Sequence, residues 1–239
     1  MKDVVQILGI PFTTLTKHQI LDSIVMGLEK KYGKTFIVTP NPELVTLALD
    51  SKEYRTVLKS ADLSLPDGIG IVWASKMLDE GIKSRITGVD FMKSLCEKVS
   101  KKPVSIGLFG AEPGVAEDAA DCLKKMYPGI RILFASSEWD SKNPPVDILF
   151  VALGSPKQEK WIYENLDKLQ VKVVMGVGGA FDMISGRVKR APIFMQQIGL
   201  EWLWRLFLQP WRLKRQLRLV RFVFLVLQNK YFHPTQLSS

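Results

Sequence analysis

The chain has 239 residues, of which 46% are hydrophobic and 24% are charged, and its formal net charge is +9. It is long enough for one large domain, or for a domain with an appendage, and apolar enough to bury a sizeable core. Its two cysteines, Cys96 and Cys122, exclude a disulfide framework and a zinc knuckle, and the N-terminus lacks the apolar segment of a secretion signal, so we expect a reduced, cytoplasmic protein.

Predicted strands and helices alternate along the chain to about Gly186. Apolar, β-branched runs that end at a turn indicate buried strands, and periodic apolar residues behind them indicate helices. In chain order, we expect strands at Val4–Ile10, at Thr35–Thr39, from Asp62, and at Val104–Gly110, Arg131–Ala135, Val146–Leu153 and Val171–Met175. We expect helices at His18–Lys31, Glu43–Asp50, Ile69–Leu78 and Val89–Ser100, after the turn that ends at Gly114, and at Lys157–Lys168. This alternation predicts one α/β domain over residues 1–191, with a mostly parallel, Rossmann-like open sheet flanked by helices.

Two glycine-containing turns follow the last two predicted strands. One runs from Gly154 to Glu159 and the other from Gly176 to Asp182. In an open α/β sheet, ligands bind at the carboxyl edge, where helix N-termini present free amide groups to anions. We therefore predict that these turns, with a third at 110–114, supply substrate-binding residues: Gly110, Ala111, Gly114, Gly154, Ser155, Lys157, Gln158, Gly178, Gly179 and Asp182. The alternative is that the glycines only make tight turns and that Asp182 caps the segment after it.

Asp67 is the residue that we predict to act as a general base. It follows a strand and lies between Pro66 and Gly68, in a short turn that fixes the direction of its side chain. A general base must lie within hydrogen-bond reach of the proton that it takes. The alternative is that Asp67 caps the helix beginning near Ile69, a position that aspartate favours.

Thr39, Asn41 and Arg85 are predicted to line the same edge of the sheet. Thr39 and Asn41 end a strand and offer a hydroxyl and an amide to a sugar or a nucleotide, although asparagine beside proline is also typical of a plain turn. Arg85 lies in a polar loop and can pair with a phosphate through two parallel hydrogen bonds, so we place it with Asp67 as catalytic. A lone surface arginine is its alternative.

Several motifs of nucleotide-binding and metal enzymes are absent from the sequence. It has no Asp-x-Asp pair, no Gly-Lys-Ser/Thr phosphate loop, no Gly-x-Gly-x-x-Gly after the first strand and no Gly-x-Ser-x-Gly elbow. Its two histidines, His18 and His233, are not part of a His/Cys cluster, so we predict neither a metal site nor a cofactor. Arginines and helix N-termini are then expected to neutralise any phosphate charge.

From Pro192 onward the sequence becomes helical, aromatic and basic, and residues 192–239 contain seven Lys or Arg and one acid. On a helical wheel, Leu213, Leu217, Val220, Phe224 and Leu227 share one face, and Lys214, Arg215, Arg218 and Arg221 lie on the opposite face. No apolar run approaches the ~20 residues that span a bilayer. We predict a helical, basic appendage on the membrane surface; the alternative is a helix that packs on its own domain or on a partner subunit.

Ordered strings along nearly the whole chain resemble the WecG/TagA/CpsF family of bacterial glycosyltransferases. They are Thr39-Pro-Asn-Pro-Glu43, Leu65-Pro-Asp-Gly68, Arg85-Ile-Thr-Gly-Val-Asp90, Gly110-Ala-Glu-Pro-Gly114, Gly154-Ser-Pro-Lys-Gln-Glu159, Gly176-Val-Gly-Gly-Ala-Phe-Asp182, Arg190-Ala-Pro192 and Gly199-Leu-Glu-Trp202. Within the family, the chain is most similar to members that act in wall teichoic acid synthesis.

The resemblance implies an inverting glycosyltransferase that works without a metal ion. The expected donor is UDP-N-acetylmannosamine, and the expected acceptor is a polyprenyl-diphosphate-linked sugar, undecaprenyl-diphosphate-N-acetylglucosamine, extended through a β-1,4 linkage. Asp67 is then expected to take the proton of the acceptor's 4-hydroxyl. The resemblance also implies that the core forms homo-oligomers and that the appendage reaches the inner face of the cell membrane. We expect a tail arginine to complete the site: Arg212, Arg215, Arg218 or Arg221.

Other functions stay open at this point. A related transferase that moves N-acetylmannosaminuronic acid, glucose or galactose fits the same residues. A non-catalytic nucleotide-binding module, or an accessory subunit of another transferase, is the alternative outside enzymes. Nucleic acid is not an expected partner, because the basic tail lacks a recognition helix or an aromatic stacking sheet.

Overall fold

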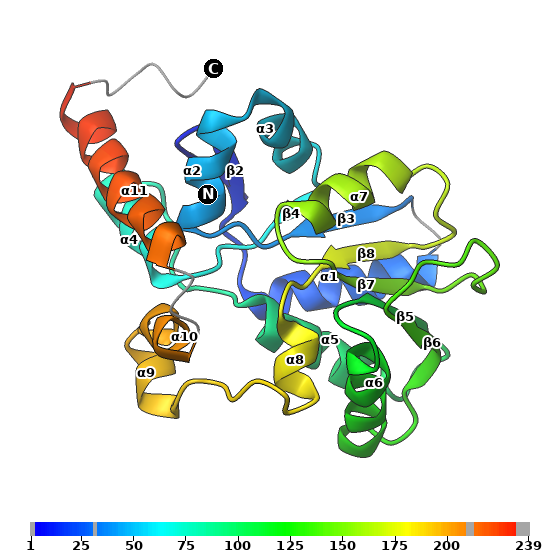
Figure 1. Cartoon of the computed structure of the whole chain (residues 1–239). Coiled ribbons are helices and arrows are strands. Elements are labelled where there is room, and N and C mark those ends of the chain that lie inside the picture. Colours follow the sequence, from blue (N-terminus) through cyan, green and yellow to red (C-terminus); the bar gives the residue numbers. More distant parts are fainter. Residues whose placement is uncertain (1–2, 31–32, 209–212, 233–239) are drawn as a thin grey trace.

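The computed structural model describes residues 3–30, 33–208 and 213–232, and a six-stranded sheet forms its centre (Figure 1). The strands are β3 (Thr35–Val38), β4 (Leu63–Ser64), β5 (Ser105–Gly110), β6 (Arg131–Ser136), β7 (Ile148–Ala152) and β8 (Val173–Gly176), in the order β4-β3-β8-β7-β5-β6. Neighbouring strands in this sheet are parallel. The predicted α/β fold with a mostly parallel sheet is therefore confirmed.

The single strand predicted at Val4–Ile10 is wrong. This segment contributes to two strands, β1 (Val4–Ile7) and β2 (Ile10–Thr13), which pair antiparallel outside the main sheet. Between them, Leu8 and Gly9 have φ angles of 50° and 75°, the left-handed conformation that a two-residue hairpin turn requires. Leucine rarely adopts this conformation, so its presence in the sequence gave no signal for a turn.

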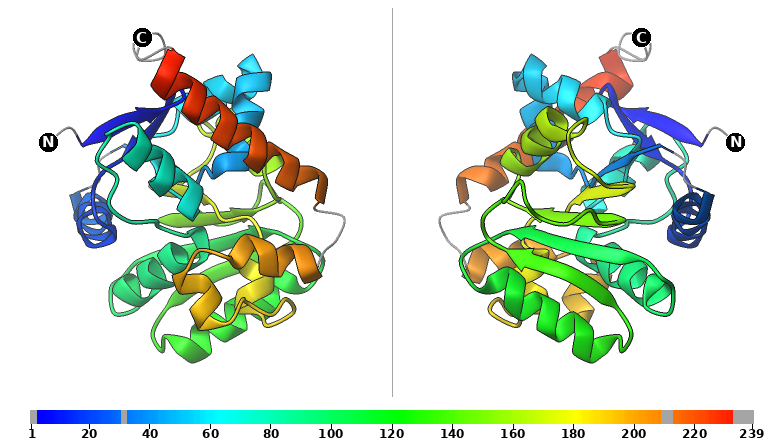
Figure 2. Two further views of the ribbon diagram at one scale, coloured as in Figure 1. Left: turned by 90° about the vertical axis from the view of Figure 1, so that its left-hand side faces the viewer. Right: turned by 90° about the vertical axis from the view of Figure 1, so that its right-hand side faces the viewer.

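Helices cover both faces of the sheet (Figures 1 and 2). On one face lie α1 (Lys17–Lys30), α5 (Gly88–Val99), α6 (Val115–Met126) and α8 (Ala180–Ile184). On the other lie the β1–β2 hairpin, α2 (Pro42–Asp50), α3 (Lys52–Lys59), α4 (Ile69–Met77) and α7 (Lys157–Asn165). The predicted helices are confirmed with small shifts at their ends, and α3 is an additional helix. Ser51 ends α2 and also caps α3 by accepting a hydrogen bond from the Tyr54 amide at 3.2 Å.

Alternate residues of the central strands enter two separate hydrophobic cores. In β3, Phe36 and Val38 pack with α2, α3 and α4, whereas Ile37 packs with α1 and α5. In β7, Leu149 and Phe150 divide in the same way. A strand buried on both faces needs apolar side chains at every position, which explains the continuous apolar runs in the sequence.

The C-terminal part forms α9 (Ile193–Gln197), α10 (Glu201–Leu208) and α11 (Leu213–Phe232). Helix α11 lies against α2 and α4 (Figures 1 and 2) and buries Phe222 and Val226 in the same core as those helices. Three residues of its predicted apolar face, Leu217, Val220 and Phe224, point away from the core and are 64–69% exposed; the side chain of Leu213 lies outside what the structure describes. No helix in the described residues combines the length and apolarity needed to cross a bilayer. The domain boundary at 191/192 stays a prediction.

Because one face of α11 is buried and the other is exposed, the same substitution on the two faces should change the free energy of unfolding by different amounts. Phe222→Ala should lower the free energy of unfolding by about 3–5 kcal/mol, because it leaves a cavity in a packed core. Phe224→Ala, two residues along the helix and 64% exposed, should change it by less than about 0.5 kcal/mol. Urea denaturation of both variants measures the difference, and equal effects would contradict the observed packing of α11.

Candidate active site

A cavity of about 300 Å³ opens at the carboxyl edge of the sheet. Four neighbouring strands, β4, β3, β8 and β7, end beside it. The structure brings nine of the predicted site residues to its wall: Thr39, Asn41, Asp67, Arg85, Gly154, Ser155, Gln158, Gly178 and Gly179. They come from turns far apart in the sequence, and the parallel sheet places those turns at one edge.

Asp67 lies at this wall in a turn that is held on both sides. Its amide donates to the carbonyl of Pro40 at 3.3 Å, and the amide of Ile86 donates to the carbonyl of Pro66 at 2.8 Å. Helix α4 has Gly68 as its N-cap residue, with a φ of 89° and without a side-chain cap hydrogen bond. The cap position that we considered for Asp67 is therefore occupied by Gly68.

Thr39 and Asn41 follow β3, in the turn next to that of Asp67, whose amide bonds to Pro40. The Asn41 side chain caps α2, since its Oδ1 accepts a hydrogen bond from the Leu44 amide at 3.0 Å. The turn also packs closely on α4, where a Cβ atom at Gly70 would lie 2.6 Å from Pro42 Cγ. Asn41 thus has the structural role given as its alternative, and it also lines the cavity.

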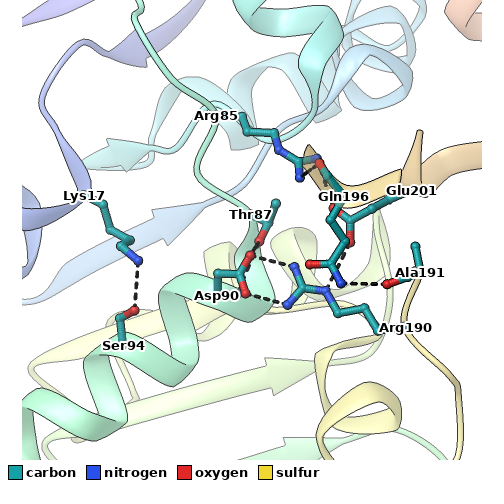
Figure 3. Close-up of polar contacts among 9 residues, drawn as sticks. All are labelled: Lys17, Arg85, Thr87, Asp90, Ser94, Arg190, Ala191, Gln196 and Glu201. Carbon is teal, nitrogen blue, oxygen red and sulfur yellow. Dashed lines mark hydrogen bonds and ion pairs between the residues drawn. The ribbon is translucent and has the colours of Figure 1, made fainter. Parts of the chain in front are cut away.

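Arg85 is held by the C-terminal part of the chain (Figure 3). Its Nη1 lies 3.0 Å from Glu201 Oε2, and its Nη2 donates to the carbonyl of Gln196. The other oxygen of Glu201 lies 3.1 Å from Arg190 Nε. Arg190 in turn forms two hydrogen bonds with Asp90, at 2.5 and 2.6 Å. Alternating charges thus join the start of α5 to the first turn of α10 beside the cavity.

The contacts in this row of charged residues shift the pKa values of Asp90 and Arg190. Burial alone would raise the pKa of Asp90, but hydrogen bonds from Arg190 and Thr87 outweigh it and lower that pKa below its usual value. The hydrogen bonds to Asp90 also raise the pKa of Arg190. Asp90, Arg190 and Glu201 were not among the predicted site residues, although all three occur in the strings that carry the family resemblance. Their pairing depends on contacts across about half the chain.

Removing the shared carboxylate should destabilise the fold measurably. Glu201→Gln leaves Arg85 and Arg190 without their common anion at a position where the Glu201 side chain is 14% exposed, so we expect a loss of about 2 kcal/mol. The matched control is Asp118→Asn, which breaks the Arg187–Asp118 pair at a position where Asp118 is 52% exposed, and it should cost less than about 1 kcal/mol. Chemical denaturation compares them, and equal losses would show that the Glu201 contacts contribute no more than a surface pair.

Seven of the predicted residues that the structure describes do not line the cavity: Arg218 and Arg221 of α11, and five residues of the core. Gly110 ends β5, which lies beyond β7 in the sheet order, and Ala111 and Gly114 follow it; the Ala111 amide donates to the carbonyl of Ala152 at 2.9 Å. Lys157 is exposed at the start of α7, and Asp182 lies in the first turn of α8. The carboxyl edge is wider than the cavity, which explains why position at this edge alone did not separate these residues from the others.

Helix α11 reaches the cavity with Leu219, which lines it, and Gly199, Glu201 and Trp202 of the preceding segment line it as well. Arg218 Nη1 lies 3.3 Å from Oε1 of Glu43, another wall residue. Arg221 pairs with Asp50 at 2.6 Å, at the last residue of α2. Arg212 and the side chain of Arg215 lie outside what the structure describes. Among the described residues, no group of three or more His, Cys, Asp or Glu could hold a metal ion.

The fold and the cavity together define an α/β protein with a candidate ligand site at the carboxyl edge of a parallel sheet. The chain belongs to the glycosyl transferase WecG/TagA/CpsF family, whose model matches residues 5–236. It is 37% identical over 231 residues, 90% of each chain, to an N-acetylglucosaminyldiphosphoundecaprenol N-acetyl-beta-D-mannosaminyltransferase of Bacillus subtilis (strain 168). It is 30% identical over 236 residues, 95% of this chain and 93% of the other, to the protein of that name from Staphylococcus aureus (strain MRSA252). The resemblance inferred from the sequence strings is confirmed.

Proposed function

We propose that this protein transfers N-acetylmannosamine from UDP-N-acetylmannosamine to the 4-hydroxyl of N-acetylglucosamine on undecaprenyl diphosphate. The names of its relatives support the transferred sugar and the lipid-linked acceptor. The observation that carries the proposal for the site is the position of Asp67, which shares one cavity wall with Thr39, Arg85 and two glycine turns. A carboxylate at a strand end, beside groups that can hold a diphosphate, suits a transfer from a nucleotide sugar.

The proposed reaction is a single displacement with inversion. Asp67 accepts the proton of the acceptor's 4-hydroxyl as that oxygen forms its bond to the anomeric carbon of the donor. The bond from this carbon to the diphosphate breaks at the same time, and UDP leaves with the bonding electrons. One base is sufficient for this step, since no covalent intermediate with the enzyme forms.

The leaving diphosphate needs positive charge or amide groups beside it. Arg85 supplies a guanidinium at the wall, with Glu201 on one side of it. Arg218, on α11, is the described tail arginine that pairs with a wall residue, Glu43. We propose that both arginines hold the diphosphate with the N–H groups that they do not use in these pairs, and that no metal ion is required.

The exposed apolar side chains of the C-terminal helices support a place on the membrane surface. Leu217, Val220 and Phe224 point outward from α11, and Phe207 of α10 is 72% exposed. The acceptor in the proposed reaction carries a polyprenyl chain, so an enzyme that acts on it must work at a bilayer. We propose a peripheral association with the inner face of the cell membrane, and homo-oligomers stay a prediction.

The test is a transfer assay with UDP-N-acetylmannosamine and a short-chain lipid-diphosphate acceptor, with and without EDTA. The expected product is a disaccharide with a β-1,4 linkage, identified by NMR, at an equal rate with the chelator. A panel of other UDP-sugars decides whether a different donor is preferred. Binding of UDP without turnover of any donor would overturn the enzyme assignment and favour a nucleotide-binding module.

A further inference from the structure

Two adjacent buried polar residues lie in the first turn of α7: Gln158 lines the cavity, and Glu159 lies behind it. Gln158 and Glu159 are each 1% exposed. Glu159 Oε1 accepts hydrogen bonds from Ser155 Oγ at 2.7 Å and from Gln158 Nε2 at 2.8 Å. Its Oε2 accepts one from the hydroxyl of Tyr54, a buried residue of α3, at 3.3 Å. A buried carboxylate is costly unless such partners satisfy it, and here three donors converge on it.

These bonds determine which way the Gln158 amide points. Its Nε2 donates to Ser155 Oγ at 3.2 Å as well as to Glu159. Its Oε1 therefore faces the turn after β8, where it accepts the amide of Gly178 at 2.9 Å. The side chain can lie there only because residue 176 is glycine, since a Cβ atom at Gly176 would lie 2.8 Å from Nε2.

The result is a link between two turns of the cavity wall. Ser155 follows β7 and Gly178 follows β8, and both line the cavity, whereas Glu159 does not. Burial raises the pKa of the Glu159 carboxyl, although the hydrogen bonds from Ser155 and Gln158 oppose this effect. Buried networks whose members are all satisfied hold their groups in one arrangement.

We infer that Glu159 is a positioning residue: through Ser155 and the amide of Gln158, it holds the Ser155 and Gly178 turns at the spacing that the bound nucleoside diphosphate requires. The nature of that ligand rests on the proposed function, whereas the link between the turns rests on the hydrogen bonds alone. Gln158 is also one of the predicted substrate-binding residues, and that prediction is untested. Both ends of its amide form hydrogen bonds inside the protein, so the amide has a role in holding the wall.

Three variants of the full chain test this inference. In Glu159→Met, the new side chain has a similar size but accepts no strong hydrogen bond. This variant should raise the KM for the UDP-sugar and the Kd for UDP by about tenfold or more, because small misplacements of binding groups have effects of this order. Glu159→Gln can present its oxygen to Ser155 and Gln158 and its amino group to Tyr54, so both constants should stay within about threefold of wild type. Tyr54→Phe is the control, since it leaves the contacts to Ser155 and Gln158 intact.

Hydrogen exchange of the Gly178 amide is the second measurement, and it does not depend on any substrate. Exchange should be slow in wild type and Glu159→Gln and clearly faster in Glu159→Met. If Glu159→Met does not fold, Glu159→Asp takes its place in the experiment, because the shorter side chain withdraws the carboxylate from Ser155 and Gln158. Unchanged KM and unchanged Gly178 exchange in the Met or Asp variant would overturn the inference. A wild-type protein that binds no UDP would overturn the proposed function, and the exchange result would still decide the role of Glu159.

Discussion

Replacing Asp67 with asparagine should lower the transfer rate by about 10²–10⁴, while the Kd for UDP stays within a few-fold of wild type. The asparagine side chain has nearly the same shape but cannot take the proton of the acceptor hydroxyl. Because Asp67 lies in a turn whose backbone is hydrogen-bonded to Pro40 and through Pro66 to Ile86, we expect the cavity to keep its form. Single-turnover rates with a saturating acceptor and calorimetry with UDP measure the two quantities separately.

Asp79→Asn is the matched control for this variant. Asp79 lies after the C-terminal end of α4, whereas Asp67 lies before its N-terminal end. Asp79 is exposed and has a φ of 58°, a conformation that asparagine tolerates well. Its transfer rate should equal that of wild type. If Asp67→Asn also retained a rate near wild type, another group would have to be the base, and the proposed mechanism would be wrong.

The second large effect is expected at the membrane. Changing Leu217, Val220 and Phe224 together to serine should weaken binding to vesicles of anionic lipid by about a hundredfold. Each side chain is more than 60% exposed, so it is available to enter the bilayer surface and contributes about 1 kcal/mol when partly buried there. Three such contributions correspond to about two powers of ten in the binding constant. Co-sedimentation with vesicles measures this constant.

Transfer assays separate anchoring from catalysis in the same triple variant. With the acceptor embedded in vesicles, the rate should fall in parallel with binding. With a short-chain, water-soluble acceptor, it should stay within a few-fold of wild type, because Phe222 and Val226 still hold α11 on the core. A control triple, Val4, Met26 and Leu133 to serine, changes exposed apolar residues elsewhere and should bind vesicles as wild type does. Equal loss in both triples would show that α11 is not the membrane-binding surface.

Much of the candidate site was predictable because the carboxyl ends of parallel strands all lie at the same edge of a sheet. Each apolar run marked a strand, and residues directly after strands must meet at one edge of a parallel sheet. Asp67, Thr39 and Gly154 were placed together on that ground, without knowledge of the strand order. The order decides the rest: β5 lies beyond β7, so the turn at Gly110 is at the same edge but away from the cavity.

The orientation of α11 shows the limit of sequence periodicity. The helical wheel separates Leu217, Val220 and Phe224 from the arginines correctly, but it does not say which side faces the protein. Arg221 pairs with Asp50 of α2, and Phe222 and Val226, which lie on the arginine side of the helical wheel, enter the core. An apolar stripe faces inward only if the fold offers an apolar surface to it, and here the core contacts the side of α11 opposite to that stripe.

By itself, then, the sequence determined the α/β class, the boundaries of most helices and strands, and the edge at which the candidate site lies, because these depend on neighbouring residues and on the period of each element. Only the tertiary structure decided which polar groups meet. Arg190 pairs with Asp90 across 100 residues, Arg85 bonds to the Gln196 carbonyl across 111, and the Gln158 side chain reaches the Gly178 amide after the neighbouring strand. No local pattern encodes such partners, since each pairing depends on the packed positions of whole helices and strands.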